Sequence, residues 1–318
     1  MDNAVSAVTG RSDARATINA KLSDEDLCQI FMTLALLDIP SLERPQGWFL
    51  QVNSVCRRWR YVALGYAELW AISAGSFPSK VMTNLTIERA RRSALRFDGH
   101  FEDHAGPGYV LTHYQQSLLE KYGDRLRSVV HDDYQDWSVL LYRLGTLPRL
   151  EMARIWDDSD SNAWDGDVVI HAPRLQGLYM NNVLIPFSAP SLRSLRVDFN
   201  QSNQSVPPDE PADDPEYQPI PTMFPTRKLI GFLQHSPLLE KLVLTGMGQL
   251  PAFNLPPVED LSVALPRLQS LDFSEAFTAM EDLLNRLQFP PETQMSIWHT
   301  GPQDNDTNSV FSFDEDQA

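Results

Sequence analysis

Two short runs of arginine are the residues of this sequence that come closest to a chemical signature. They are Arg57-Arg58-Trp59-Arg60 and Arg89-Ala90-Arg91-Arg92. Basic side chains interleaved with an aromatic ring can bind the phosphates and bases of nucleic acid. Both runs are short, however, and the apolar spacing around the first turns Trp59 inward. A solvated helix face is therefore the simpler interpretation of both runs.

Two spacings could begin a metal site, and both are incomplete. His100 and His104 are four residues apart, but glycine and proline flank them and no further ligand stands close by. The segment Asp158-x-Asp160-x-Asn162 is similar to the start of a calcium-binding loop. Ala163 replaces its turn glycine and Val169 replaces its bidentate acid. We expect no metal and no cofactor.

Sequence motifs of the common enzyme classes are absent. The chain has no Gly-x-Gly-x-x-Gly, no Gly-Lys-Ser/Thr phosphate loop, no Gly-x-Ser-x-Gly and no His-Glu-x-x-His. Catalytic groups need not be neighbours in sequence, so an unrecognised hydrolase in the acidic C-terminal half remains an alternative. A deep pocket with a converging acid, histidine and nucleophile would favour that alternative, and a shallow curved surface would count against it. We expect a protein that is not an enzyme.

Charge divides the chain into two parts. Of 318 residues, 26 are Lys or Arg and 42 are Asp or Glu, which gives a formal charge of −16. Residues 1–97 carry 12 basic and 9 acidic side chains, whereas residues 98–318 carry 14 and 33. The acidic part would repel phosphate backbones and anionic lipid and would tolerate or attract a basic polypeptide. We therefore expect no nucleic-acid or membrane partner.

The cysteines and the apolar runs indicate a reducing compartment. Only Cys28 and Cys56 are present, so a disulfide-stapled fold and a four-cysteine zinc site are both excluded. Both cysteines lie on or beside apolar stripes, where a free thiol acts as a small hydrophobe. The N-terminus has no signal-peptide core, and the longest apolar stretch is too short to span a bilayer. We expect a soluble protein of the cytosol, the nucleus or both.

The segments that position these residues begin with a capped helix. Ser23 and Asp26 have the spacing of a capping box, and Leu22 can pack outside the cap on Leu27. The acidic side chains of residues 24–26 suit the positive end of the helix dipole. Four apolar residues follow at helical spacing and predict a helix to about Leu37, namely Leu27, Ile30, Phe31 and Leu34.

A second helix is predicted from about Trp48 to Leu64. Its apolar residues alternate steps of four and three, and they are Trp48, Val52, Val55, Trp59 and Val62. Arg57 and Arg60 point to the opposite side. Tyr66 and Trp70 follow, and we expect them to pack back on the two helices.

Beyond residue 78 the sequence becomes repetitive. A repeat phrase of the form Pro-x-Leu-x-x-Leu-x-apolar begins at Pro173, Pro190, Pro237 and Pro266, and a degraded copy begins at Pro148. The last two apolar positions of the phrase are two residues apart and would lie on one face of a short strand. Such strands stack in parallel, and each unit needs its neighbours to cover its apolar face. The phrase therefore predicts an irregular solenoid.

Other segments extend this pattern. We expect a helix at Lys80–Arg92 with a strand at Ala94–Phe97, and another strand at Leu126–Val130. A last helix at about Ala276–Leu287 and a strand near Met295–Trp298 complete the prediction. Residues 201–225 are acidic and rich in proline, and we expect them to form a disordered insertion. The expected organisation is a disordered segment 1–17, a helical domain 18–75, a solenoid 76–300 and an acidic tail 301–318.

The helical segments resemble an F-box protein of the kind abundant in mushroom-forming fungi. The passages that carry the resemblance are Leu22-Ser-Asp-Glu-Asp-Leu-Cys-Gln-Ile-Phe31, Val52-Asn-Ser-Val-Cys-Arg-Arg-Trp-Arg-Tyr-Val-Ala-Leu64 and Glu68-Leu69-Trp70. Leucine-rich repeats commonly follow such an F-box. Ser23 departs from the family's proline, and the connection from Asp38 to Gly47 is longer than in compact F-boxes. The resemblance implies an α/β protein with an N-terminal helical F-box and an irregular leucine-rich-repeat-like solenoid of parallel strands and helices.

What this family implies is the substrate-recognition subunit of an SCF-type cullin-RING ubiquitin ligase. The F-box would bind a Skp-type adaptor, and through it a cullin, by placing apolar side chains in a partner groove. By the resemblance, the adaptor-binding residues are Leu22, Leu27, Ile30, Phe31, Val52, Val55, Cys56 and Trp59. Some of these must instead form the core of the domain, and the sequence leaves that division open.

The protein substrate is expected on side chains that flank the buried positions of the repeat strands and face away from the core. These are Tyr179, Asn181, Arg196, Asp198, Lys241, Thr245, Asp272 and Ser274. An ordinary solvated strand surface is the competing interpretation. For the whole protein, the alternative is a leucine-rich interaction scaffold that does not engage the adaptor.

Overall fold

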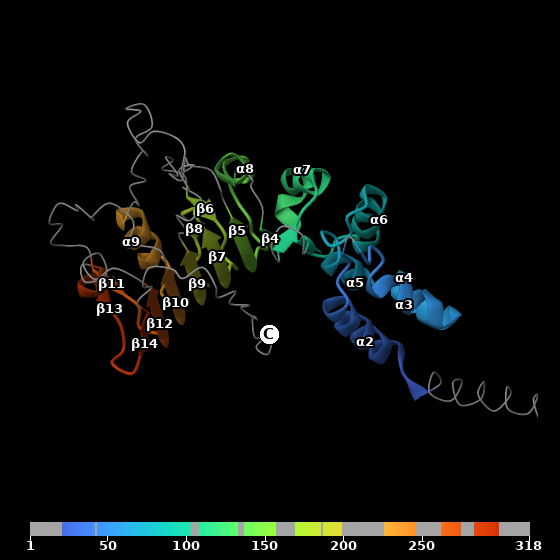
Figure 1. The fold of residues 1–318 in the computed structure, drawn as a ribbon, viewed down its shortest axis with the longest axis horizontal. Coiled ribbons are helices and arrows are strands. Elements are labelled where there is room, and N and C mark those ends of the chain that lie inside the picture. Colours follow the sequence, from blue (N-terminus) through green and yellow to red (C-terminus); the bar gives the residue numbers. More distant parts are fainter. Residues whose placement is uncertain are drawn as a thin grey trace, which may run out of the picture.

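The chain folds as a mixed α/β protein with helices at its N-terminal end and a long parallel sheet behind them (Figure 1). A computed structural model describes residues 21–41, 43–102, 108–132, 137–156, 169–185, 187–198, 226–245, 262–274 and 283–298. The N-terminal helices are α2 (Asp24–Leu37), α3 (Trp48–Val55), α4 (Arg57–Gly65), α5 (Ala67–Ile72) and α6 (Lys80–Ala90).

Helix α2 begins and ends where the sequence predicts. The Ser23 hydroxyl accepts a hydrogen bond from the Asp26 N–H at 3.1 Å, and the Asp26 carboxylate accepts one from the Ser23 N–H at 2.8 Å. These two bonds satisfy backbone groups that the first helical turn leaves unpaired. They also lower the pKa of Asp26.

The second predicted helix is broken into two, which corrects the expectation of one helix from Trp48 to Leu64. Cys56 has extended backbone angles, φ −161° and ψ 173°, and separates α3 from α4. The break follows two side chains that bond back to the backbone of the preceding turn. Asn53 donates to the Phe49 carbonyl at 2.7 Å, and Ser54 donates to the Gln51 carbonyl at 3.0 Å. Such bonds compete with the helix ladder, and apolar periodicity does not reveal them.

Among the described residues, the sheet has eight parallel strands that follow one another in sequence order. They are β1 (Leu95–Asp98), β4 (Leu126–His131), β5 (Met152–Trp156), β7 (Gly177–Asn181), β9 (Ser194–Asp198), β10 (Lys241–Thr245), β12 (Ser270–Ser274) and β14 (Gln294–Trp298). The strands expected near Ala94–Phe97, Leu126–Val130 and Met295–Trp298 are confirmed, as is the helix expected from Lys80. Because neighbouring strands run parallel, each connection must cross back over a face of the sheet from the end of one strand to the start of the next.

Each repeat phrase forms a tight turn followed by a strand. The first leucine of each phrase donates its N–H to the carbonyl three residues earlier, with N···O distances of 3.0–3.2 Å, at Leu150, Leu175, Leu192, Leu239 and Leu268. The proline is thereby the second residue of a β-turn, a position for which its fixed φ is suited. The same turn recurs before β14, where the Thr293 N–H donates to the Pro290 carbonyl at 3.1 Å.

One backbone hydrogen bond links each of these units to the one before it. The N–H groups of Glu151, Gln176, Arg193, Glu240, Gln269 and Gln294 donate respectively to the carbonyls of Arg127, Glu151, Gln176, Arg193, Glu240 and Gln269, at 2.7–2.8 Å. The spacing of the phrases in sequence varies, but this contact does not. The connection between β9 and β10 is longer than the one between β7 and β9, yet the register is kept and Ser194 pairs with Lys241.

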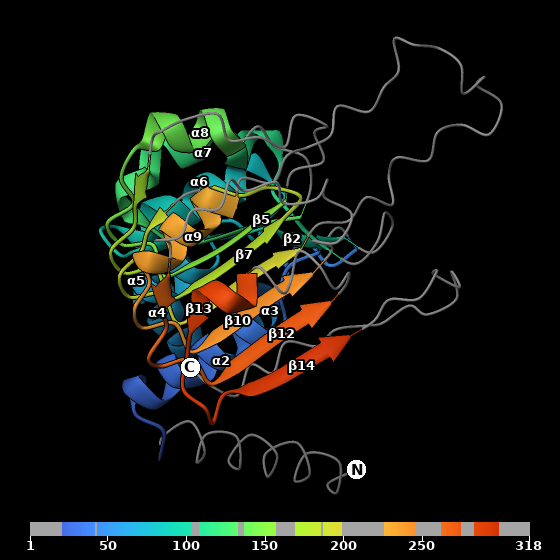
Figure 2. The same ribbon diagram turned by 90° about the vertical axis from the view of Figure 1, so that its left-hand side faces the viewer.

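The return connections lie on one side of the sheet, as Figures 1 and 2 show. They include α7 (His113–Tyr122), the 3-10 turn η1 (Gly123–Arg125), α8 (Trp137–Leu144) and α9 (Thr226–Gln234). Short parallel pairs also form there, between β6 (Ile170–His171) and β8 (Phe187–Ser188) and between β11 (Val263–Ala264) and β13 (Leu287–Gln288). A small antiparallel hairpin of β2 (His100–Glu102) and β3 (Gly108–Val110) follows β1.

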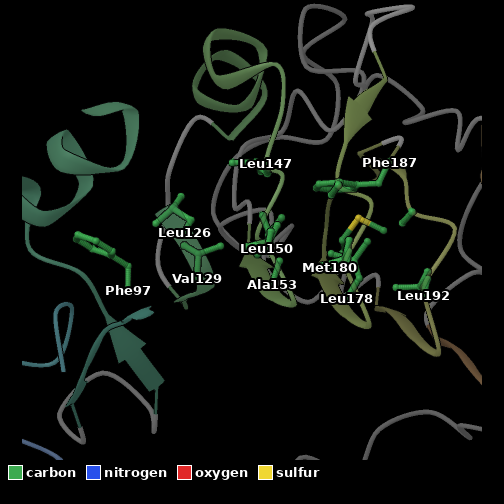
Figure 3. Close-up of a cluster of buried hydrophobic side chains, with 14 of the residues drawn as sticks. Phe97, Leu126, Val129, Leu147, Leu150, Ala153, Leu178, Met180, Phe187 and Leu192 are labelled. Carbon is green, nitrogen blue, oxygen red and sulfur yellow. The ribbon is translucent and has the colours of Figure 1, made fainter. Parts of the chain in front are cut away.

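Alternate strand residues build a single core between the sheet and its return connections. Phe97, Val129, Ala153 and Met180 are at most 3% exposed, and Figure 3 shows side chains from successive strands lying next to one another. Full burial of a large aliphatic side chain contributes about 1.5–3 kcal/mol. We call these alternate buried positions the inner row and the opposite side of the strands the outer face.

Several expectations fall wholly or partly outside the described residues. These are the disordered segment 1–17, the insertion 201–225 and the tail 301–318. The last predicted helix is described only from residue 283, where residues 283–286 are helical. Leu287 then lies in β13, which corrects the expected end of that helix. Within the described part of the chain, no helix is long and apolar enough to cross a membrane.

Candidate functional site

The N-terminal helices pack on one another through the apolar residues that the sequence assigns to adaptor binding. Leu27, Phe31 and Val52 are 0% exposed and belong to the core of the chain. This corrects their assignment as contact residues, because a side chain already enclosed by its own chain presents no surface to a partner. Their role is to hold α2 and α3 in place.

The other expected adaptor residues remain accessible to different degrees. Leu22, Ile30 and Trp59 are half-buried and pack against the core, where the Trp59 ring meets Phe31 edge-on with ring centroids 5.3 Å apart. Cys56 is partly exposed at the break between α3 and α4. Val55 is 49% exposed. These five residues are the ones that a partner could touch.

Sequence reasoning missed further apolar side chains on the exposed sides of the same helices. Leu37 is 74% exposed at the end of α2, Leu50 is 58% exposed on α3, and Tyr61 is 80% exposed on α4. Leu36 and Leu64 are also exposed. Their position off the main apolar stripes was the available signal, since a helix with one buried face has no internal need for them. We call Leu36, Leu37, Leu50, Val55, Tyr61 and Leu64 the exposed apolar residues of α2–α4.

Two arginines of the first run, Arg58 and Arg60, make contacts that hold the helices together. Arg58 Nη2 lies 2.6 Å from Asp24 Oδ1 and donates to the Leu22 carbonyl at 2.8 Å. Arg60 donates to the Asn53 carbonyl at 2.8 Å. Arg58 thus joins α4 to the start of α2, and Arg60 satisfies the last turn of α3.

A second surface lies on the outer face of the sheet. The strand pairing places Arg154, Tyr179 and Arg196 side by side on β5, β7 and β9. The Tyr179 ring lies between the two guanidinium groups, whose central carbons are 5.1 and 5.3 Å from the ring centroid. Arginine is attracted to the electron-rich face of an aromatic ring. We call these three residues the Arg-Tyr-Arg stack.

Buried aspartates fix both ends of the Arg-Tyr-Arg stack. Arg154 Nε is 2.6 Å from Asp132 Oδ1, an ion pair without the alignment of a hydrogen bond. Arg196 Nε donates to Asp198 Oδ2 at 2.8 Å, and the Thr245 hydroxyl donates to Asp198 from β10. Burial raises the pKa of Asp132 even though Arg154 opposes the shift. The arginines are therefore held in one geometry by carboxylates from the same chain.

Of these groups, Tyr179 has the pKa that is shifted furthest from its ordinary value. Burial and the neighbouring Asp198 carboxylate raise the pKa of the Tyr179 phenol to about 12. The phenol oxygen also accepts a hydrogen bond from the Asn181 side-chain amide at 3.2 Å. Tyr179 is consequently a neutral hydrogen-bonding group at any physiological pH.

The structure brings the expected substrate residues to one face, with two corrections. Tyr179, Arg196, Lys241, Thr245 and Asp272 are exposed or half-buried on the outer face. Ser274 pairs with Thr245 in the register of the same strands. Asn181 and Asp198, in contrast, are only 8% and 5% exposed. Their side chains are buried beside Tyr179 and Arg196, so they hold these neighbours in place and are not themselves accessible to a partner.

Sequence reasoning missed that a motif on this face occurs twice. Arg96 and Asp98 form an ion pair along β1 at 2.6 Å, and the Ser128 hydroxyl of β4 donates to Asp98. Arg196 and Asp198 repeat this arrangement on β9, with the Thr245 hydroxyl of β10 as donor. The Arg-x-Asp spacing was the available signal, because residues two apart share one face of a strand.

No cluster of three or more metal-ligating side chains occurs in the part of the chain that is described. His104 and Asp158–Asn162 lie outside that part. A hollow beneath α7 and α8 is lined only by apolar side chains, among them Leu119, Trp137 and Phe187. It lacks the converging acid, histidine and nucleophile that hydrolysis would require.

Comparisons with known proteins add no relative to this description. No family model, no curated protein and no solved structure matches the chain. Its function must therefore be argued from the two surfaces described above.

Proposed function

We propose that this chain is the substrate-recognition subunit of an SCF-type cullin-RING ubiquitin ligase. In this proposal α2–α5 are an F-box that binds a Skp-type adaptor, and through it a cullin. The parallel strands that follow are a leucine-rich-repeat-like solenoid that holds the protein to be ubiquitinated. The chain itself makes and breaks no bond, and it acts in the cytoplasm, the nucleus or both.

The observation that carries the proposal is the set of exposed apolar residues of α2–α4. Their side chains face solvent from three helices whose inner sides are already filled by buried residues, such as Leu27 on α2, Val52 on α3 and Val62 on α4. Exposed apolar side chains concentrated on one small unit are typical of a protein-binding surface. These helices are also the segments that resemble an F-box. A partner with an apolar groove would bury this surface by helix-in-groove docking.

The outer face of the sheet supports the second half of the proposal. Neighbouring strands present Tyr179, Arg196 and Lys241 in a fixed order, because backbone pairing sets the register. An ordered row of aromatic and charged groups can bind an extended polypeptide without moving. The acidic balance of residues 98–318 favours a basic client.

A leucine-rich interaction scaffold without an adaptor is the second candidate. The burial of Leu27, Phe31 and Val52 favours it, because three of the residues matched to adaptor contacts are used by the chain itself. The two candidates differ in whether a Skp-type adaptor binds α2–α4.

The experiment is copurification of the full chain with a Skp-type adaptor. The variant Val55→Asp places a charge at an exposed apolar position, and Gln29→Asp places the same charge on an exposed polar residue of α2. We expect the wild type and Gln29→Asp to coelute with the adaptor and Val55→Asp to lose it. Leu27→Asp is a poorer test, because it would unfold the helices and abolish binding for an unrelated reason.

Two outcomes of this experiment would contradict the proposal. If neither the wild type nor the variants coelute with the adaptor while circular dichroism shows all three folded, the ligase proposal fails and the scaffold remains. If all three coelute, the adaptor binds elsewhere and the exposed apolar residues of α2–α4 are not its site.

A further inference from the structure

The described part of the sheet region holds more cations than carboxylates. Residues 98–318 carry 14 basic and 33 acidic side chains, and the described residues among them carry all 14 basic but only 10 acidic ones. The formal charge of that described part is therefore +4, in contrast to −19 for the whole region. Where these cations lie, and which of them have a carboxylate partner, decides what kind of ligand the fold can attract.

Five arginines on or next to the strands are paired with a carboxylate of the same chain. Their N···O distances are 2.5–2.8 Å, and the pairs are Arg96–Asp98, Arg127–Glu151, Arg154–Asp132, Arg193–Glu240 and Arg196–Asp198. Arg125, Arg149 and Arg174 differ, because among the described residues no carboxylate lies within ion-pair distance of any of them. Arg149 and Arg174 are exposed, and Arg125 is half-buried.

These three arginines occupy the same position of three successive units. Each stands three residues before a strand residue, and those strand residues, Ser128, Met152 and Gly177, are paired in register. Figure 2 shows the strands pointing one way, so the three arginines lie along the edge at which β4, β5 and β7 begin. Adjacent strands are about 4.8 Å apart, which sets the spacing from one arginine backbone to the next. At this position Ser191 follows on β9, so the run ends at Arg174.

Backbone carbonyls hold two of these guanidinium groups and bring a fourth arginine beside them. Arg125 donates to the Ser93 carbonyl through Nε at 3.3 Å and through Nη2 at 3.0 Å. Arg149 Nη1 donates to the carbonyl of Arg92 at 3.3 Å, and Arg92 is itself exposed. We call Arg92, Arg125, Arg149 and Arg174 the arginine row.

The positive charges of the arginine row act on one another. Burial lowers the pKa of Arg125, and the positive charge of Arg149 adds to this shift, while Tyr122 and Asp124 oppose it. Cations held this close repel each other, and a bound anion would offset that repulsion. Each guanidinium group has five N–H donors, so the carbonyl contacts leave donors over for such an anion. The planar fork of these donors fits a carboxylate with two parallel hydrogen bonds.

From these observations we propose that the arginine row binds an acidic segment of a partner protein through aspartate and glutamate carboxylates. The segment lies across the starts of β4, β5 and β7, so that neighbouring arginines bind successive acidic side chains. The arginine row is distinct from the outer face, on which Arg154 and Arg196 already have carboxylate partners. This inference does not depend on the proposed ligase function.

An acidic polypeptide is favoured over nucleic acid as the occupant. Nucleic acid is a long polyanion whose affinity grows with the number of phosphates that a protein neutralises. The arginine row has four cations, and a nucleic-acid strand longer than the row would be repelled by the net charge of −16. A short acidic segment interacts with the row alone, since exposed charges more than about 8 Å away are screened at physiological salt.

The experiment measures binding of a fluorescein-labelled hexaglutamate peptide to the full chain by fluorescence anisotropy at about 50 mM salt. One double variant, Arg149→Gln with Arg174→Gln, removes two exposed cations of the arginine row. A matched control, Arg57→Gln with Arg143→Gln, removes two exposed cations from α4 and α8 and has the same net charge. We expect the first variant to weaken binding at least about tenfold and the control to weaken it less than about twofold.

Two further probes separate carboxylate binding from other interactions with the same surface. A labelled hexaglutamine peptide has no charge and should not bind, and a labelled hexathymidylate should bind more weakly than hexaglutamate. The proposal is overturned if the wild type does not bind hexaglutamate, if hexaglutamine binds as tightly, or if both double variants lose the same affinity. Tighter binding of hexathymidylate would also overturn it and would assign the arginine row to nucleic acid. All four substituted arginines are exposed, so circular dichroism should show both variants folded.

Discussion

The side-chain amide of Gln115 donates a 2.7 Å hydrogen bond to the backbone carbonyl of Phe77. The same amide donates to the Gly75 carbonyl at 2.9 Å, while its oxygen accepts the Thr112 N–H at 2.8 Å. Gln115 is fully buried. One residue of α7 therefore caps its own helix and also holds the loop after α5, whose Gly75 N–H donates to the Arg96 carbonyl of β1 at 3.0 Å. The N-terminal helices and the sheet are joined through it.

Replacing Gln115 with methionine should lower the free energy of unfolding by about 2–4 kcal/mol. The new side chain has a similar size but can neither donate nor accept these bonds. The Gly75 carbonyl then loses the Gln115 donor and the Thr112 N–H loses its acceptor, while the Phe77 carbonyl keeps the Thr83 hydroxyl as a donor. Urea denaturation followed by tryptophan fluorescence measures the change. The exposed Ser117→Ala on the same helix should alter stability by less than about 0.5 kcal/mol. Equal effects of the two changes would contradict the role assigned to Gln115.

Gly75 should tolerate alanine far less well than Gly65. A Cβ at Gly75 would stand 2.6 Å from the Cα of Phe97, and β1 cannot move away because it pairs with β4. We expect a loss of more than about 2 kcal/mol in the free energy of unfolding. At Gly65, the last residue of α4, nothing lies within 4 Å of the added Cβ. Gly65→Ala should be neutral or stabilising, and thermal denaturation of the two variants would compare them directly.

The elements that could be predicted from sequence are those whose cause is local. The capping box of α2 involves Ser23 and Asp26, which are three residues apart, and each repeat phrase combines a proline turn with a strand that follows at once. The same reasoning failed at Cys56, because side chains of the preceding turn compete for the helix backbone there.

The candidate sites were predictable only in part, because their geometry depends on neighbours distant in sequence. A stripe of apolar residues identifies Leu27 and Val55 as one class, but it does not say that Leu27 is enclosed and Val55 exposed. Tyr179 was expected on the outer face. That Arg154 stacks on it could be known only from the register of β5 and β7.

The alkaline pH dependence of stability should reveal the environment of Tyr179. Its pKa is raised to about 12 in the folded chain from an ordinary value of 10.0, so the phenol ionises first in the unfolded chain. Ionisation there draws the equilibrium toward unfolding, and stability is lost as the pH rises from 10 toward 12. Two pKa units correspond to at most about 3 kcal/mol.

Tyr179→Phe removes this titration. The difference in unfolding free energy between wild type and variant should therefore shift in favour of the variant between pH 9 and pH 11, as urea denaturation at each pH would show. Tyr142→Phe is the matched control, because Tyr142 is 63% exposed. A constant difference across this range would mean that Tyr179 is not buried against Asp198.

Stability and partner binding should separate at Leu27 and Val55, which belong to the same predicted surface. Leu27 is enclosed by the core, so Leu27→Ala should cost about 2–5 kcal/mol in the free energy of unfolding. Val55 is 49% exposed on α3, so Val55→Ala should change that free energy by less than about 0.5 kcal/mol. Urea denaturation of the isolated protein measures both.

If the chain binds a Skp-type adaptor as proposed, affinity for that adaptor should rank the two variants in the opposite order, because of the two residues only Val55 presents its side chain to a partner. Titration calorimetry at a temperature where both variants are folded should give a larger loss for Val55→Ala. Truncating one apolar contact residue of an interface typically costs about 1 kcal/mol or more, which is about a fivefold change in the dissociation constant. If Leu27→Ala weakens binding more than Val55→Ala while remaining folded, the adaptor contacts must involve a rearranged core, and the division between enclosed and exposed residues drawn from this structure would be wrong.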